Sequence, residues 1–189
     1  MRLGHVLAVS CLLSGHALGA ELSGTAQTAG KPTQYAIVWL DAPNAPPLAQ
    51  SPRVSIDQRN LDFAPHVIAI RVGTTVEFPN NDRVFHNVFS FRDGKKFDLG
   101  MYPAGANSKP VIFDKPGLSR IFCNIHPHMA AYVMAVDTPY FAVSDARGGF
   151  SIAGVPAGTY TYHAWRPGGE TLTGTATVDT THPLDIKWP

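Results

Sequence analysis

Three side chains that bind transition metals lie close together at Cys123, His126 and Met129. They offer a thiolate, an imidazole and a thioether, a combination that suits copper in an electron-transfer site. A loop that supplies three ligands needs one more from elsewhere in the fold. His86, which enters a predicted strand after a polar turn, can provide it. We therefore expect one mononuclear copper ion bound by His86, Cys123, His126 and Met129.

His128 is the alternative to His126 as the second imidazole ligand. Adjacent side chains of an extended backbone point to opposite sides, so His128 and Met129 do not readily face the same metal. His126 and Met129 are three residues apart across Pro127 and can converge. The sequence favours His126, with His128 exposed beside the site, and keeps His128 as the alternative ligand.

Other metals and reactions fit the residues less well. Zinc accepts a thiolate and imidazoles, but copper binds such ligands more tightly and a thioether is a soft ligand. A nucleophile and base pair of Cys123 and His126 would lack a third group to orient the base. The chain also has no His-Glu-x-x-His segment or glycine-rich phosphate loop. We expect no enzymatic activity, and we expect the other histidines beyond the leader to be surface or hydrogen-bonded residues: His66, His163 and His182.

The elements that must position these ligands are predicted to be short β-strands. Apolar residues come in short runs, rich in β-branched and aromatic side chains and separated by Gly and Pro turns. No window has a sustained helical period. The sequence therefore predicts an all-β sandwich, with strands at residues 33–40, 67–72, 75–78, 84–91, 111–113, 118–122 and 132–136.

The first twenty residues have the layout of a secretory signal peptide. Arg2 precedes an apolar run from Val6 to Leu13, and small residues follow through Gly19 and Ala20. We expect a signal peptide over residues 1–20 and export to the periplasm. No later segment is long and apolar enough to cross a membrane.

Charge and cysteine content narrow the choice of partners. The chain has 15 Lys and Arg against 14 Asp and Glu, and loss of Arg2 with the leader balances them. Nothing in this balance suggests nucleic acid as a partner. Of the two cysteines, Cys11 lies in the leader, so Cys123 is the sole thiol of the exported protein. A lone thiol in an oxidising compartment is buried, reactive, paired between molecules or bound to metal.

Two segments carry a family resemblance. In one, Asn80 leads into His86 and Asn87; in the other, a turn at Pro116–Gly117 and an aromatic strand ending at Phe122 precede the ligand loop. Together they resemble the cupredoxin family, plastocyanin and pseudoazurin among them, over residues 51–137. The resemblance implies a Greek-key β-sandwich and the following ligand roles: His86 and His126 as imidazoles, Cys123 as thiolate and Met129 as axial thioether.

The spacing of the ligand loop departs from this resemblance. Only two residues separate His126 from Met129, fewer than plastocyanin-like loops have. The short spacing resembles the end of the loop in binuclear copper centres, but those carry a second cysteine that this exported chain lacks. The predicted site is therefore mononuclear.

The flanking segments resemble a different family. The segments Gly149–Ile152, Val155–Tyr160 and Ala164–Trp165 resemble the carboxypeptidase regulatory-like family, a small prealbumin-like β-sandwich, and so do the strands that begin at Leu22. We expect residues 138–189 to form this module and residues 21–50 to supply N-terminal strands and a linker, with the possibility that both ends form one discontinuous domain. The whole arrangement resembles exported plastocyanin-like proteins often labelled methylamine utilization proteins, although no residue here indicates amine chemistry.

Electron transfer to a redox partner protein is the expected function. Hydrogen bonds from Asn87 or backbone amides to the Cys123 sulfur would tune the potential, and an apolar rim at Phe85, Pro127 and Ala130 would dock the partner. The alternative is a periplasmic copper chaperone or store, or a binding module without redox activity.

Overall fold

A computed structural model describes residues 19–189 except 47, 92, 180 and 181. Nearly all of the predicted signal peptide therefore lies outside the described residues. All of the regular secondary structure in the described residues is β-strand, which confirms the all-β prediction. The described residues include no helix with the length and apolar character needed to cross a bilayer.

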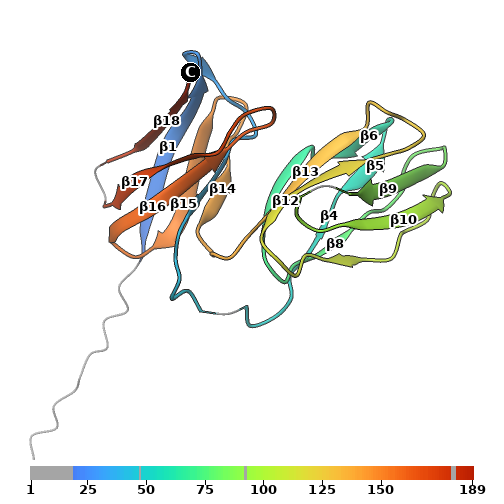
Figure 1. The fold of residues 1–189 in the computed structure, drawn as a ribbon, viewed down its shortest axis with the longest axis horizontal. Coiled ribbons are helices and arrows are strands. Elements are labelled where there is room, and N and C mark those ends of the chain that lie inside the picture. Colours follow the sequence, from blue (N-terminus) through green and yellow to red (C-terminus); the bar gives the residue numbers. More distant parts are fainter. Residues whose placement is uncertain (1–18, 47, 92, 180–181) are drawn as a thin grey trace, which may run out of the picture.

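Residues 51–137, here called the central module, form a sandwich of two main sheets (Figure 1). One sheet has the order β10 (Phe97–Tyr102), β9 (His86–Ser90), β12 (Gly117–Phe122), β13 (Ala130–Val136) and β7 (Val67–Arg71). The other has the order β11 (Val111–Ile112), β8 (Thr75–Glu77) and β4 (Arg53–Ser55). A hairpin of β5 (Asp57–Arg59) and β6 (Asp62–Ala64) lies beside them.

Two of the predicted ligands, Cys123 and Met129, are buried in the core of the central module. Cys123 and Met129 lie in one apolar cluster with Phe63, Phe78 and Phe113, all of them almost completely buried. Burial of aromatic and aliphatic side chains on this scale is the main driving force for folding such a module. The core therefore fixes two ends of the ligand loop without help from a metal.

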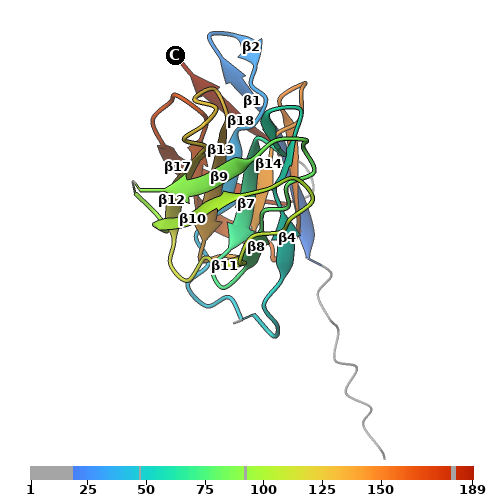
Figure 2. The same ribbon diagram turned by 90° about the vertical axis from the view of Figure 1, so that its right-hand side faces the viewer.

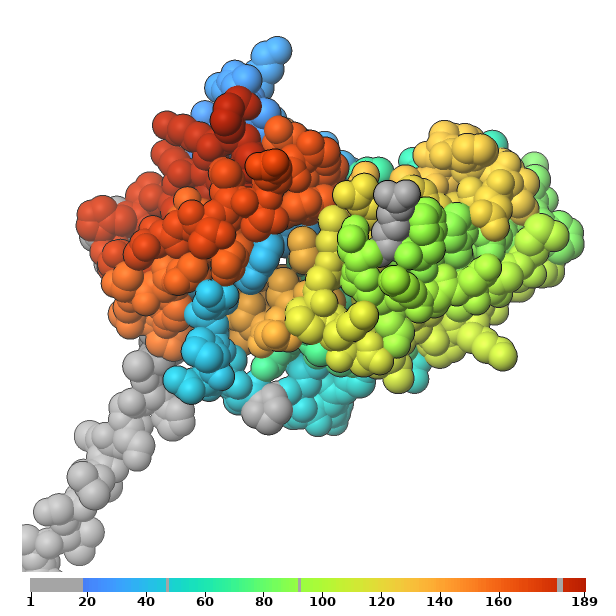
Figure 3. Space-filling model, in the orientation of Figure 1, coloured from blue at the N-terminus to red at the C-terminus, as the bar shows by residue number. Residues whose placement is uncertain are grey.

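Strands from both ends of the chain share two further sheets, here called the terminal module (residues 19–50 and 138–189). β1 (Ala20–Thr28) lies between β15 (Gly149–Val155) and β18 (Leu184–Trp188) and also pairs with β2 (Lys31–Pro32). The other sheet has the order β14 (Phe141–Val143), β3 (Ile37–Leu40), β16 (Gly158–Trp165) and β17 (Leu172–Val178). In Figure 3 the blue N-terminal and red C-terminal residues accordingly form one lobe.

The two modules meet through an apolar interface. Val67, Met134 and Val136 of the central module are buried against Ile37 and Trp165 of the terminal module. Viewed from the side of the central module, the terminal strands lie behind it (Figure 2). Burial of this kind of surface stabilises a fixed arrangement of two domains better than a polar contact does.

Strand β13 is buried on both faces because it serves two cores. Ala131, Val133 and Ala135 face the core of the central module, while Met134 and Val136 face the terminal module. Side chains alternate between the faces of a strand, so both sets must be apolar. This accounts for its continuous apolar sequence.

The predicted strands correspond to observed ones, but some boundaries and elements differ. The strand expected at 84–91 begins only at His86, because the Asn80 side chain bonds the Val84 carbonyl at 2.9 Å and holds residues 84 and 85 in the preceding loop. β10 was not anticipated, since a register shift between Asp98 and Met101 breaks its alternation. The other strands that were not anticipated are β4, β5, β6, β14, β17 and β18.

Tyr102 links the sheets through a buried hydroxyl, which gives a first prediction. The hydroxyl donates to the Phe78 carbonyl at 2.8 Å and accepts from Gln58 Nε2 at 2.5 Å, and burial raises the pKa of Tyr102 to about 12. The neutral phenol is thus favoured in the folded state, so its stabilisation is complete below about pH 10 and is lost as the pH rises through about 12. Tyr102→Phe should lower the free energy of unfolding by about 1 kcal/mol at pH 7 and flatten its decline between pH 10 and 12.

Denaturant unfolding of both proteins at pH 7 and pH 11 measures this difference. Tyr160→Phe is the matched control. Tyr160 lies in the terminal module, away from the central core, and its hydroxyl donates to the Pro156 carbonyl of its own turn. Equal alkaline loss in wild type and Tyr102→Phe would contradict the assignment.

Candidate metal centre

Strand order brings the predicted ligands together. β12 lies between β9 and β13, and Phe122 pairs with Phe89 on one side and with Ala130 on the other. Cys123 follows the last residue of β12, and His86 is the first residue of β9. The loop of residues 123–129 therefore closes over the start of β9. This loop, gold in Figure 1, lies at the end of the central module that points away from the terminal module.

Three ligand atoms converge within this end of the module. The Cys123 sulfur lies 3.8 Å from Nδ1 of His86 and 3.8 Å from Nδ1 of His126, and the two Nδ1 atoms are 3.1 Å apart. Cys123 and His86 are buried and His126 is partly exposed. The structure thus gathers three of the four predicted ligands around a single point.

The spacing of these donors fits one transition-metal ion. The point equidistant from the two nitrogens and the sulfur lies about 2.1 Å from each of them, within the range of about 2.0–2.3 Å known for zinc bonds to imidazole and thiolate. A trigonal arrangement of two imidazoles and a thiolate, completed by a weak thioether, is the donor set of blue-copper sites. The residues present therefore fit copper.

Met129 is buried and His128 is exposed. Met129 is completely buried in the core with Cys123, and its N–H donates to the His126 carbonyl at 2.9 Å, which closes the turn across Pro127. His128 is exposed, and its Nε2 lies 3.0 Å from the Leu61 carbonyl oxygen. His128 therefore stands outside the group formed by His86, Cys123 and His126.

Asp82 contacts the ligand His86 and was not singled out by the sequence. Its Oδ2 lies 3.1 Å from Nε2 of His86. Hydrogen bonds from the backbone N–H groups of Leu61 and Arg83, and from the ring of His86, hold the pKa of Asp82 below its usual range. The signal that would have indicated it is its place in the polar turn, four residues before His86.

Two asparagines hold the ligand loops in place. Asn80 is completely buried, and its side chain bonds the backbone of Asp82, Val84 and Tyr102. Asn87 was one of the expected donors to the Cys123 sulfur, beside backbone amides. Its Nδ2 instead donates to Asp98 at 2.9 Å, while its Oδ1 accepts from the Asn124 N–H at 3.4 Å. It therefore links β9 to the ligand loop through backbone rather than through sulfur.

The remaining described histidines have other partners. His66 packs against the rings of Tyr35 and Tyr132 at centroid distances of 5.6 and 5.5 Å. His163 stacks on Trp39 and bonds Asp41 and Thr173, each at 3.0 Å. These contacts agree with the prediction of structural histidines.

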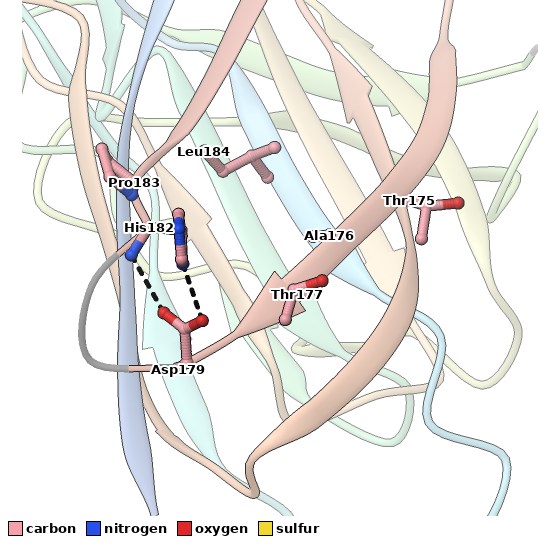
Figure 4. A pocket seen from close by; sticks show the side chains of 7 residues that line it. All are labelled: Thr175, Ala176, Thr177, Asp179, His182, Pro183 and Leu184. Carbon is pink, nitrogen blue, oxygen red and sulfur yellow. Dashed lines mark hydrogen bonds and ion pairs between the residues drawn. The ribbon is translucent and has the colours of Figure 1, made fainter.

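His182 lies in a surface cavity of about 340 Å³ in the terminal module (Figure 4). The Asp179 carboxylate accepts a hydrogen bond from the backbone N–H of His182 at 2.9 Å and bonds Nδ1 of the His182 ring at 2.7 Å. The two side chains thus satisfy one another at the rim of the cavity. The lining includes no sulfur ligand, and within the described residues the group of metal-binding side chains is the one at Cys123.

Comparison with known proteins agrees with this geometry. Residues 51–137 match the family described as copper binding proteins, plastocyanin/azurin family. No curated protein matches the chain.

Solved structures similar to the chain include a purple cupredoxin from Nitrosopumilus maritimus, with 26% identity, a TM-score of 0.39, and coverage of 43% of this chain and 98% of that one. Amicyanin from Paracoccus versutus has 21% identity, a TM-score of 0.38, and coverage of 52% and 97%. A copper-containing nitrite reductase from Thermus scotoductus SA-01 has 27% identity and a TM-score of 0.43; the match covers 52% of this chain but 25% of the reductase.

The family match and the converging donors lead to the same conclusion. Residues 51–137 form a plastocyanin/azurin-family cupredoxin domain with a type 1 copper site at His86, Cys123, His126 and Met129.

Proposed function

We propose that this protein is an exported electron carrier. The observation that supports this most directly is the buried trigonal group of two imidazole nitrogens and a thiolate, with separations of 3.1 to 3.8 Å. A copper ion bound there would cycle between Cu(I) and Cu(II), the one-electron chemistry of such sites.

The residues of the site supply three conditions for electron transfer. Cys123 and Met129 are anchored in the apolar core, so the ligand positions change little between oxidation states. Asn80 and Asn87 fix the loops that carry the ligands. His126 is the ligand that is partly exposed, and its ring edge offers the shortest route to a partner.

An apolar surface surrounds that exposed edge. Val84, Phe85 and Ile125 are 41%, 54% and 41% exposed, and Pro127 is also exposed. The predicted rim at Phe85 and Pro127 is thus solvent-facing, with Ala130 only partly so. We infer that a redox protein with a complementary apolar face docks here, because exposed apolar groups of this kind mark interaction sites and the balanced charge of the chain offers little electrostatic attraction.

The terminal module and the location of the protein belong to the same proposal. We infer that residues 21–50 and 138–189 form one discontinuous prealbumin-like sandwich, because β1 pairs with β15 and β18 and β3 pairs with β14 and β16. The apolar run and small residues of the leader support export to the periplasm. In this proposal the module holds the copper domain by its rear face, through β13 and β7, and leaves the ligand loop free.

The visible spectrum of the copper-loaded protein tests the function. Addition of Cu(II) should give intense thiolate charge-transfer absorption that bleaches with ascorbate and returns on reoxidation. Weak d–d bands alone would exclude an electron carrier of this type. Complete transfer of copper to a competing chelator within minutes would favour the chaperone alternative, whereas retention over hours supports the carrier.

A further inference from the structure

The carboxylate of Asp82 lies directly behind the ligand His86. Its Oδ2 is 3.1 Å from His86 Nε2, the His86 side chain has no exposed surface, and that of Asp82 is 14% exposed. An ionised carboxylate can only accept hydrogen bonds, so Nε2 must carry the proton. In the neutral imidazole, the form that binds a metal, the lone pair is then on Nδ1, the atom that faces Cys123 and His126.

Backbone donors hold this carboxylate in its orientation. The Leu61 N–H donates to Oδ2 at 2.7 Å, and the Arg83 N–H donates to Oδ1 at 3.0 Å. The N–H of Asp82 itself donates to the side chain of the buried Asn80 at 3.1 Å. Both carboxylate oxygens are therefore engaged, and rotation toward solvent would break several hydrogen bonds at once.

The β5–β6 hairpin connects this carboxylate to the other ligand loop. Asn60 and Leu61 have φ of 57° and 60°, as the two central residues of a type I′ turn do. Leu61 donates its N–H to Asp82 and accepts from His128 Nε2 with its carbonyl at 3.0 Å. At the base of the hairpin, Gln58 is completely buried and bonds Tyr102. One residue, Leu61, thus bridges the loops that carry His86 and His126.

From this geometry we propose that Asp82 is a positioning residue, whose carboxylate aims Nδ1 of His86 into the copper site and lowers the reduction potential of that site. The inference rests on the proposed electron-transfer function. Carboxylates behind a ligating histidine fix its tautomer and raise its basicity. The negative charge of Asp82 also favours the more positive Cu(II) state of the site over the Cu(I) state.

Asp82→Asn in the full chain tests the proposal, because the amide keeps the shape and removes the charge. We expect the affinity for Cu(II) to fall by about 10 to 100-fold, the usual cost of losing such a partner, and the affinity for Cu(I) to fall less. Each tenfold fall in the affinity for Cu(II) relative to the affinity for Cu(I) raises the reduction potential by about 59 mV. Cyclic voltammetry and competition titrations measure both quantities.

Asp57→Asn is the matched control. Asp57 lies on the β5–β6 hairpin, and its substitution removes the same charge. Its carboxylate bonds Asn81, next to Asp82, and Arg59, and it does not contact a ligand. The control should keep the wild-type potential. An unchanged potential in Asp82→Asn, or an equal shift in Asp57→Asn, would overturn the proposal while the electron-transfer function stood.

Nitrogen-15 NMR of the copper-free wild-type protein provides a test that needs neither the variant nor copper. We expect His86 to carry its proton on Nε2, with Nδ1 unprotonated. The opposite tautomer would refute the positioning role. Absence of the thiolate band in the copper-loaded wild type, together with the expected tautomer, would count against the proposed function but not against the orientation of His86.

Discussion

Cys123→Ser is expected to abolish the intense visible absorption of the copper-loaded protein completely. The band arises from charge transfer between thiolate sulfur and copper, and Cys123 is the free cysteine of the described residues. A serine hydroxyl is a harder and far less acidic donor, so copper affinity should also fall by more than about 100-fold, beyond the usual cost of losing an outer-shell partner. Absorption spectroscopy and a competition titration measure the two effects.

The same variant tests whether folding depends on the metal. Cys123 is packed in an apolar cluster, so the buried hydroxyl should cost about 1–3 kcal/mol, but the cluster itself needs no metal. The copper-free variant should retain the β-sheet circular dichroism of the copper-free wild type. Unfolding of the copper-free wild type would instead indicate a structural metal, whose binding energy is folding energy. A persistent visible band in Cys123→Ser would refute the thiolate assignment.

His126→Ala is the second substitution for which we expect a very large effect. Nδ1 of His126 lies 3.8 Å from the sulfur and 3.1 Å from Nδ1 of His86, so its removal opens one side of the trigonal group. The type 1 spectrum should disappear, and any remaining copper should show weak bands and a changed electron paramagnetic resonance spectrum. External imidazole should restore part of the thiolate band, because the cavity left by the ring adjoins solvent.

His128→Ala is the natural comparison, since it removes the same side chain two positions away. His128 is exposed and contacts the Leu61 carbonyl, so its loss should leave the thiolate band nearly unchanged. The reverse pattern, with His128→Ala bleached and His126→Ala unaffected, would show that His128 is the ligand and that Met129 does not bind.

The types of the ligands and the chemistry they support were predictable from local sequence. Cys123, His126 and Met129 lie on one loop, and the backbone geometry of adjacent residues was enough to favour His126 over His128. Short apolar runs separated by Gly and Pro likewise predicted an all-β fold. These features depend on neighbours in the chain, so no knowledge of distant contacts is needed to infer them.

Partners that act across the fold depended on tertiary structure. Asp82 becomes important only when the hairpin tip at Leu61 meets it, and the apolar pattern of β13 is explained only by the two cores on its two faces. The pairing of β1 with β18 joins residues more than 150 positions apart. Such contacts are set by the summed burial of apolar surface over the whole chain, which no local pattern encodes. Local sequence was therefore enough to identify the residues that can bind copper, whereas the control of their orientation depends on contacts between distant segments.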